Sequence, residues 1–309
     1  MANRKSVKNI PDLVFYFSHK LLGLLVVALF LLMFVCIGIM SKPAFAELGT
    51  SLLLGLKWIP GQKVYGMLPV IYGTLVSSLV ALLISVPVSL CIALYLVEIA
   101  PYRLKVVVSF LVEMLAAIPS IVFGMWGLFV LVPFMRTWMQ PTLLKTVGWL
   151  PFFQGPPFGM GLLTAAIILA IMIMPTITAV CVEVFKTVTA IQKESVLGLG
   201  ATRWEMIKLA VIRASTSGIV GASVLGLGRA FGETMAVTMV IGNVSRISLS
   251  LFEPSQSMAS LLANQYAEAD SDLHLAALTA VGFILFIIAL IINFFARWIV
   301  LRYRRTHGA

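Results

Sequence analysis

Six long runs of mostly apolar residues constrain this chain more than any other feature. By residue number they cover 21–40, 68–97, 106–133, 159–182, 215–243 and 273–300. A helix that crosses a bilayer needs about 20 such residues, so each run is long enough for one crossing. Only 11% of the 309 residues are charged, less than half of the roughly 25% that soluble domains carry. The sequence therefore predicts an all-α, polytopic membrane protein with six transmembrane helices.

Three of the runs, the second, third and fifth, are longer than a perpendicular crossing needs, so they must tilt, kink or project beyond the bilayer. Pro87, Pro119 and Pro175 lie inside apolar runs. Proline removes one helical hydrogen bond and clashes with the preceding turn. We therefore expect kinks at these three positions.

The first apolar run has some features of a signal peptide, because basic residues precede it and Ala44–Ala46 resembles a cleavage site. However, its apolar run of about 20 residues exceeds the 7 to 15 of a signal peptide. We expect it to be retained. The expected organisation is a cytoplasmic N-terminal segment (1–20), a first transmembrane helix with an outer loop (21–64), a transmembrane domain (65–301) and a cytoplasmic tail (302–309).

The distribution of lysine and arginine indicates the orientation. With the N-terminus inside, 15 of these residues fall in inner segments and 6 in outer loops, while Arg229 falls within an apolar run. Because basic residues accumulate on the cytoplasmic side, both termini and the loop 183–213 are predicted to be cytoplasmic. The net charge of +10 is explained in the same way, since no basic stripe with interleaved aromatics suggests nucleic-acid binding.

The cysteines and histidines give no sign of a metal centre or a disulfide framework. Cys36, Cys91 and Cys181 are odd in number and lie in separate apolar runs, so they are expected to be small buried hydrophobes. No phosphate-binding loop, dinucleotide loop or nucleophile elbow is present. We therefore expect no catalytic residue, no metal and no bound cofactor in this chain.

Two charged residues, Arg229 and Glu233, lie four positions apart in the middle of the fifth run. Charges at this depth are costly and mark pathways or binding sites. A continuous helix would place both on one face, where the planar arginine fork suits oxyanions and the glutamate balances it. Glu113 in the third run is a further candidate pathway residue. The alternatives are a structural ion pair for Arg229 and Glu233 and an ordinary interfacial carboxylate for Glu113.

Small and acidic residues suggest weaker hypotheses. Glycines within the apolar runs are expected to let helices pack closely; these are Gly124, Gly127, Gly226, Gly228 and Gly232. An acidic outer loop contains Glu268, Asp270 and Asp272. It is predicted to be a solvated loop, with contact to a binding protein as the alternative.

The loop between the fourth and fifth runs has apolar residues at helical spacing on both sides of Gly200. This predicts two short helices joined at a glycine, which adopts positive φ without strain. The pattern Glu194-x-x-x-x-x-Gly200-Ala201 resembles the EAA loop of ABC-importer permeases, although Ser195-Val196 replaces the usual Ala-Ala and Arg213 replaces a frequent proline. The alternative is an amphipathic helix on the lipid surface.

That resemblance implies a coupling helix that docks on a cytoplasmic ATPase. The residues carried over from the motif are Glu194, Gly198, Gly200 and Ala201. A short helix with an apolar side and a charged rim suits binding to a protein groove.

Four further phrases are similar to PstC-type permeases of phosphate ABC importers, from about residue 65 onward. They are YGMLPVIYGTL (65–75), EMLAAIPSIVFGMWG (113–127), LGRAFGETMAV (227–237) and LANQYAEA (262–269). The resemblance implies the type I permease fold of ABC importers, in a bacterial cytoplasmic membrane, with inorganic phosphate as the substrate. The implied partners are a PstA-type permease, a PstB-type ATPase dimer that binds ATP and Mg, and a periplasmic PstS-type phosphate-binding protein.

Other functions are consistent with parts of this sequence. The nearest is an ABC permease for another oxyanion or a small solute, which the loop motif alone does not distinguish. A secondary transporter or proton relay would use Glu113, Arg229 and Glu233, but it has no ATPase to dock. An intramembrane enzyme would need a nucleophile–base pair, and none is visible.

Overall fold

The structure, a computed structural model, describes residues 10–307 and the side chains of residues 13–298. Within this part, six helices are long and apolar enough to cross a membrane, as the sequence predicts. They are Leu13–Leu48, Leu68–Ile99, Ser120–Val147, Leu162–Lys186, Arg203–Gly232 and Asp272–Trp298.

Most elements follow one another with short connections, although residues 241–257 between α12 and α13 form a long one. Several long helices contain π-helical segments (η2, η3, η4, η6). The helices up to residue 147 are α1 (Ile10–Leu48), α2 (Thr50–Leu54), α3 (Leu68–Leu94), η2 (Tyr95–Ile99), α4 (Tyr102–Ala117), α5 (Ser120–Trp126), η3 (Gly127–Leu131), α6 (Val132–Phe134), η4 (Met135–Met139) and α7 (Gln140–Val147). The later ones are α8 (Leu162–Lys186), α9 (Ala190–Gly198), α10 (Arg203–Met206), η6 (Ile207–Ile212), α11 (Arg213–Gly232), α12 (Met235–Val240), α13 (Met258–Gln265) and α14 (Asp272–His307). Strands β1 (Trp58–Ile59) and β2 (Val64–Tyr65) form a small antiparallel hairpin, and η1 (Pro60–Gln62), η5 (Pro151–Phe153) and η7 (Tyr266–Glu268) are short 3-10 turns.

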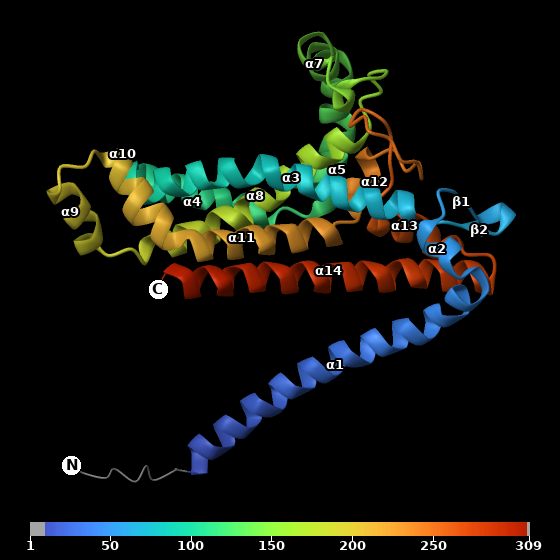
Figure 1. The fold of residues 1–309 in the computed structure, drawn as a ribbon, viewed down its shortest axis with the longest axis horizontal. Helices are drawn as coiled ribbons and strands as arrows, with labels where there is room; N and C mark the ends of the chain where they lie inside the picture. Colours follow the sequence, from blue (N-terminus) through green and yellow to red (C-terminus); the bar gives the residue numbers. More distant parts are fainter. Residues whose placement is uncertain (1–9, 308–309) are drawn as a thin grey trace.

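Helices α3, α8, α11 and α14 run alongside one another and form the body of the molecule (Figure 1). The turn between α9 and α10 lies at one end, which we call the loop end. The β1–β2 hairpin and α13 lie at the other, which we call the hairpin end. Helix α8 is the most deeply buried of the six crossing helices, since 67% of its apolar window lies inside the protein. A helix that is apolar all round is expected at such a central position.

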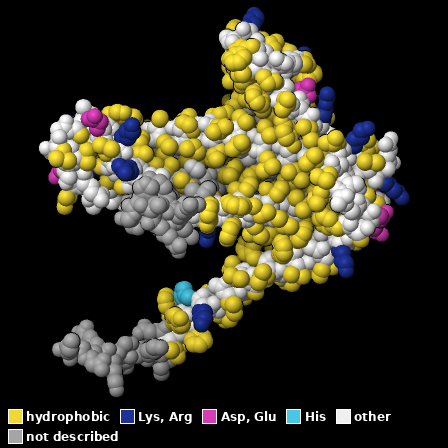
Figure 2. Space-filling view, in the orientation of Figure 1, with side chains coloured by type: hydrophobic (Ala, Val, Ile, Leu, Met, Phe, Trp, Pro, Cys, Tyr) yellow, Lys and Arg dark blue, Asp and Glu magenta, His cyan; other side chains and the backbone are white. Residues whose placement is uncertain are grey.

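Helix α1 diverges from the body along most of its length (Figure 1). Only the part near the hairpin end packs on α14, where the Phe34 and Phe283 ring centroids lie 5.0 Å apart and Gly38 faces Phe283. The preceding side chains of α1 are exposed. Figure 2 shows that apolar side chains cover most of the visible surface and that charged ones gather toward its extremities. Such a surface suits lipid or other membrane helices.

The third apolar run is not one helix, so the predicted span 106–133 is wrong in its bounds. Helix α4 ends at Ala117, and Ile118 and Pro119 have extended backbones with ψ of 128° and 140°. The residue before a proline is pushed out of the helical region, which explains the break. The crossing helix begins at Ser120, while Pro87 and Pro175 lie inside α3 and α8, which continue through them.

The fifth run also differs from the predicted continuous helix 215–243. The crossing helix starts earlier, at Arg203, and α11 ends at Gly232. Glu233 is extended, with ψ of 121°, and α12 begins two residues later. The first and last helices are longer than expected, because α1 starts at Ile10 and α14 continues to His307, into the predicted tail. Residues 1–9 of the predicted basic N-terminal segment, which include Arg4, Lys5 and Lys8, lie outside the described residues.

Candidate transport pathway and coupling surface

Arg229 lies in the last turn of α11 and is bonded to α8. Its Nη1 donates a hydrogen bond to Oγ1 of Thr176 over 3.1 Å. Thr176 follows Pro175 directly on α8, and both Arg229 and Thr176 are half-buried. A positive charge near the C-terminal end of a helix is favoured by the helix dipole. The sequence singled out Arg229 but did not indicate Thr176.

Glycines bring α8 and α11 close enough for this bond. A Cβ at Gly226 would lie 2.7 Å from Ile177 Cδ1, and one at Gly218 would lie 2.4 Å from Val184 Cγ1. Both distances are below a normal contact, so the two positions need glycine for the observed approach of the helices. The prediction of a packing glycine is thus confirmed for Gly226.

The other predicted packing glycines divide into two groups. A Cβ at Gly124 would lie 2.7 Å from Met239 Sδ, and one at Gly127 the same distance from Ile168 Cδ1. These two are confirmed as close contacts. Gly228 and Gly232 face open space within this chain, so no helix of this chain packs closely against them.

Glu233 does not face Arg229 as a helical neighbour, because α11 ends one residue before it. Its Oε1 instead accepts a hydrogen bond from the backbone N–H of Ala236 over 3.3 Å, at the start of α12. Among the described residues, no ion pair joins Arg229 to a carboxylate. The hypothesis of one helical face with an Arg229–Glu233 pair is therefore wrong for this chain.

The two interrupted helices meet. Helix α5, which follows the break at Pro119, packs on α12, which follows the break at Glu233 (Figure 1). A Cβ at Gly124 would lie 3.0 Å from the Cα of Ala236. Non-helical backbone within a membrane is tolerated where protein buries it or where it lines a watery cavity. The packing of α5 on α12 is consistent with burial of these two breaks by protein.

Glu113 lies on α4, near the end of that helix, and its side chain is exposed. Within the described part of the chain it has no hydrogen bond or ion pair, and so no contact with Arg229. Its neighbours Phe110, Leu111 and Met114 are also exposed. A carboxylate on such an apolar face needs water or a polar group from another subunit.

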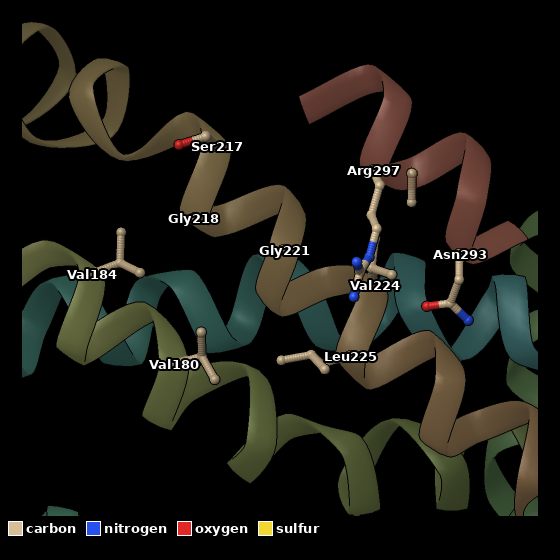
Figure 3. Close-up of a pocket in the computed structure, with 10 residues that line it drawn as sticks. Val180, Val184, Ser217, Gly218, Gly221, Val224, Leu225, Asn293 and Arg297 are labelled. Atoms are coloured by element: carbon tan, nitrogen blue, oxygen red, sulfur yellow. The ribbon is translucent and has the colours of Figure 1, made fainter. Parts of the chain in front are cut away.

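A groove of about 530 Å³ lies between α8, α11 and α14 (Figure 3). Val180 and Leu225 line it, each one helical turn from the Thr176–Arg229 bond. Its polar groups include Arg297 and Asn293, both on α14. Because most of its wall is apolar, an anion that entered this groove would lose its water and gain few hydrogen bonds in return. We therefore do not assign it to the substrate.

The loop between α8 and α11 folds in part as the sequence predicts. The short helix α9 is followed by a turn at Gly200, but the second segment, α10, is the start of the continuous crossing helix Arg203–Gly232 and not a separate short helix. Gly200 has φ of +86°, a conformation that favours glycine. Each helix begins with a capping box, Thr189 with Gln192 and Thr202 with Glu205, which satisfies backbone donors at both N-termini. The loop is shorter than predicted, because α8 continues to Lys186.

Large apolar side chains project from this loop into solvent. Ile191 is 75% exposed, Leu199 89% and Trp204 64%. Glu194 and Gly198 are exposed as well, whereas Ala201 is half-buried. Exposed apolar side chains that cluster with charges are typical of a protein-binding surface.

One ion pair attaches the loop to the body of the protein, and the sequence did not indicate it. Nζ of Lys193 on α9 lies 2.6 Å from Oε1 of Glu98 in η2. The pairing spans 95 positions in the chain, so neither periodicity nor motif spacing reveals it. In the acidic segment 268–272, Asp270 Oδ1 lies 3.3 Å from Nδ1 of the buried His274, while Glu268 and Asp272 are exposed.

Six crossing helices, a cation fixed at a helix interruption and an exposed helix–turn–helix together define a multi-pass transport permease. The family of binding-protein-dependent transport system inner membrane components matches residues 86–305. The chain belongs to this family, and it is therefore a multi-pass inner-membrane protein.

Curated relatives extend the similarity over nearly the whole chain. It is 42% identical to the phosphate transport system permease protein PstC of Mesorhizobium japonicum over 304 residues, which cover 97% of this chain and 93% of the relative. It is 47% identical to the protein of the same name from Pasteurella multocida over 272 residues, which cover 87% of this chain and 85% of the relative. These similarities confirm the family predicted from the four sequence phrases.

Solved structures confirm the ABC-importer permease fold. A chain of the inward-facing MetNI methionine ABC transporter has a TM-score of 0.59 at 17% identity, covering 80% of this chain and 99% of that one. A chain of a bacterial alginate ABC transporter has a TM-score of 0.61 at 16% identity, covering 94% of this chain and 96% of that one. At these identities the likeness concerns the fold alone.

Proposed function

We propose that this chain is a permease subunit of an ATP-driven importer that moves inorganic phosphate across the cytoplasmic membrane. The observation that carries the proposal is the 42% identity to a phosphate transport permease over 97% of the chain. The permease contributes the path for the anion. It performs no covalent chemistry, and ATP and Mg bind to a partner ATPase.

Arg229 is the proposed contact for the anion. A phosphate ion in a low-dielectric pathway needs positive charge and hydrogen-bond donors to replace its water. The guanidinium offers five donors, and the observed bond to Thr176 engages one nitrogen, Nη1. No carboxylate among the described residues neutralises it. This arrangement supports a fixed cation that is open to an exchangeable anion.

Glu233 and Glu113 have different parts in the proposal. Glu233 shapes the interruption beside Arg229, since its carboxylate accepts a hydrogen bond from the backbone N–H of Ala236 in the first turn of α12. Glu113 remains a pathway candidate, because its exposed carboxylate on α4 needs a polar surrounding that a pathway between two permeases supplies. We propose a PstA-type permease as the second half of that pathway.

The helix–turn–helix at the loop end is the proposed docking surface for a PstB-type ATPase dimer. Its exposed Ile191, Leu199 and Trp204 supply apolar area for a groove on the partner. Glu194, Gly198, Gly200 and Ala201 form the rim and the turn. This end and both termini are proposed to be cytoplasmic, and a PstS-type binding protein is proposed to deliver phosphate at the hairpin end.

Reconstitution tests the substrate and the energy source together. The chain is assembled with its permease partner and ATPase in liposomes, and uptake of radioactive phosphate is measured with the binding protein and ATP. Uptake should require ATP, and sulfate should compete poorly. Equal uptake of sulfate would favour a permease for another oxyanion. Phosphate uptake driven by a proton gradient without ATP would favour the secondary transporter.

A further inference from the structure

Among the residues that the structure describes, helix α9 makes one side-chain polar contact with the body of the protein. Among the described residues, the Lys193–Glu98 ion pair is the hydrogen-bonded link between an α9 side chain and a residue outside the loop. The remaining α9 hydrogen bonds stay within the loop, such as that from Ser195 Oγ to the Ile191 carbonyl. No residue of α9 is fully buried. The ion pair is therefore the main directional attachment of this helix.

The pair is largely withdrawn from water. The Glu98 side chain is 8% exposed and that of Lys193 is 21% exposed. Exposed ion pairs contribute little, because water screens them and side-chain entropy opposes them. A carboxylate as buried as that of Glu98 depends much more strongly on its partner, since an unpaired buried charge is costly.

Glu98 occupies a position from which a displacement can reach the pathway. It lies in η2, which ends the α3 crossing and packs on α8 and on α4. Four residues later begins α4, the helix that carries Glu113. Earlier in α3, Ser89 Oγ donates a hydrogen bond to the carbonyl of Met174 on α8, and Met174 lies two residues before Thr176. A rigid path of helices and hydrogen bonds thus leads from α9 to the Arg229–Thr176 bond.

We infer that Glu98 and Lys193 are positioning residues that couple the movement of the docking helix α9 to the junction of α3 and α4. This inference rests on the proposed docking of an ATPase at α9. When the ATPase displaces α9, the short ion pair moves η2 with it. Without the pair, α9 moves independently, so ATP hydrolysis continues with less transport.

The test uses the whole reconstituted transporter and measures phosphate imported per ATP hydrolysed. The single variants Glu98→Gln and Lys193→Met should lower this ratio by about five-fold or more. Five-fold is the lower end of the effect that one coupled site usually has on another. The amount of ATPase that co-purifies with the permease should stay normal. The charge-swapped variant Glu98→Lys/Lys193→Glu should restore the ratio, which a role in stability alone does not predict.

A second ion pair provides a matched control. Glu183 and Lys186 on α8 also lie 2.6 Å apart, but their side chains are 72% and 44% exposed. Lys186→Met and the corresponding charge swap should leave both the ratio and the assembly unchanged.

Two results would overturn the inference. The first is a normal ratio of phosphate to ATP in both single variants. The second is a charge-swapped transporter that assembles but keeps a low ratio of phosphate to ATP. This result decides the case if the single variants fail to assemble. The wild-type transporter gives a separate check. Absence of ATP-driven phosphate uptake there would contradict the proposed function itself, whereas normal wild-type uptake with unaffected variants would contradict the coupling role alone.

Discussion

Arg229 on α11 is bonded to Thr176 on α8, with 3.1 Å between Nη1 and Oγ1. The nearest carboxylate in the sequence, Glu233, turns instead to the backbone of Ala236. Among the described residues, the arginine is therefore held by a neutral hydroxyl and not by a carboxylate. This arrangement favours a site for an anion over a structural ion pair between Arg229 and Glu233. The two alternatives predict different effects of substitutions at these residues.

Arg229→Gln should abolish phosphate uptake while the transporter still assembles, because the charge is lost and the side chain remains polar. Arg229→Lys should retain partial activity at best, since lysine keeps the charge but not the planar fork. Radioactive phosphate uptake and membrane abundance are measured on the same preparations. Normal uptake by Arg229→Gln at normal abundance would remove Arg229 from the pathway.

Thr176→Val tests whether the hydroxyl orients this arginine. The variant is nearly the same size but cannot accept the bond from Nη1, so the guanidinium should become less ordered. We expect a loss of about 0.5–1.5 kcal/mol of stability for one hydrogen bond, together with a higher phosphate concentration for half-maximal uptake. Thr176→Ser, which keeps the hydroxyl, is the control. If Thr176→Val behaves like Thr176→Ser in both measurements, the bond is not functional.

Two substitutions of Glu233 distinguish a structural hydrogen bond to α12 from the role of a counter-ion. Glu233→Gln retains an oxygen that accepts from Ala236, so thermal stability and assembly should remain near normal, and uptake should persist. Glu233→Ala removes this hydrogen-bond acceptor and should lower stability by about 0.5–1.5 kcal/mol, the usual net contribution of one hydrogen bond. A loss of uptake in Glu233→Gln at normal stability would show that the charge itself acts in transport.

Local physics made part of this site predictable. The cost of a charge at membrane depth singled out Arg229, and the glycine between two apolar periodicities predicted the turn at Gly200. The course of the chain around Glu233 was not predictable in the same way, because its bond to the Ala236 backbone depends on where α11 ends. The partner Thr176 was hidden because the bond crosses between helices that are distant in sequence.

The glycines of α11 allow a test of helix packing. Gly226→Ala places a Cβ 2.7 Å from Ile177 Cδ1. Since this contact is too close, the variant should lose about 1–3 kcal/mol through overpacking unless Ile177 shifts. Gly228→Ala, which faces open space within this chain, is the matched control and should leave the isolated subunit as stable as wild type. Thermal unfolding in detergent measures both, and equal stability of the two variants would contradict the packing role of Gly226.

The third apolar run shows what hydropathy alone misses. Pro119 predicted a kink, and the stronger effect of proline on the preceding residue produced a complete break instead. Hydropathy continues through this break, because the side chains on both sides face apolar surroundings. Hydropathy therefore gave the number of crossing helices correctly but misplaced the bounds of the third and fifth.

The orientation of the chain is testable by labelling single cysteines in a background that lacks Cys36, Cys91 and Cys181. Trp149, beyond α7, and Ile191 on α9 are both strongly exposed and are therefore suitable positions. An impermeant thiol reagent added to intact spheroplasts should label Trp149→Cys but should label Ile191→Cys only after lysis, because basic residues favour the loop end as cytoplasmic. Labelling of Ile191→Cys before lysis would reverse the proposed orientation.

Gly200 gives the sharpest test of the docking surface at the loop end, because its φ of +86° is unfavourable for residues with a branched side chain. Valine in this left-handed region costs roughly 1–2 kcal/mol, so Gly200→Val should shift the turn and misalign α9 relative to α10. Asparagine tolerates the same conformation, so Gly200→Asn should preserve it. No neighbouring atom lies within 4 Å of a Cβ at this position, and any difference between the two variants therefore arises from the backbone. We expect Gly200→Val to insert normally but to bind the ATPase weakly and import little phosphate, while Gly200→Asn remains near wild type. If both variants import phosphate and stimulate ATP hydrolysis equally well, the geometry of this turn does not transmit the action of the ATPase.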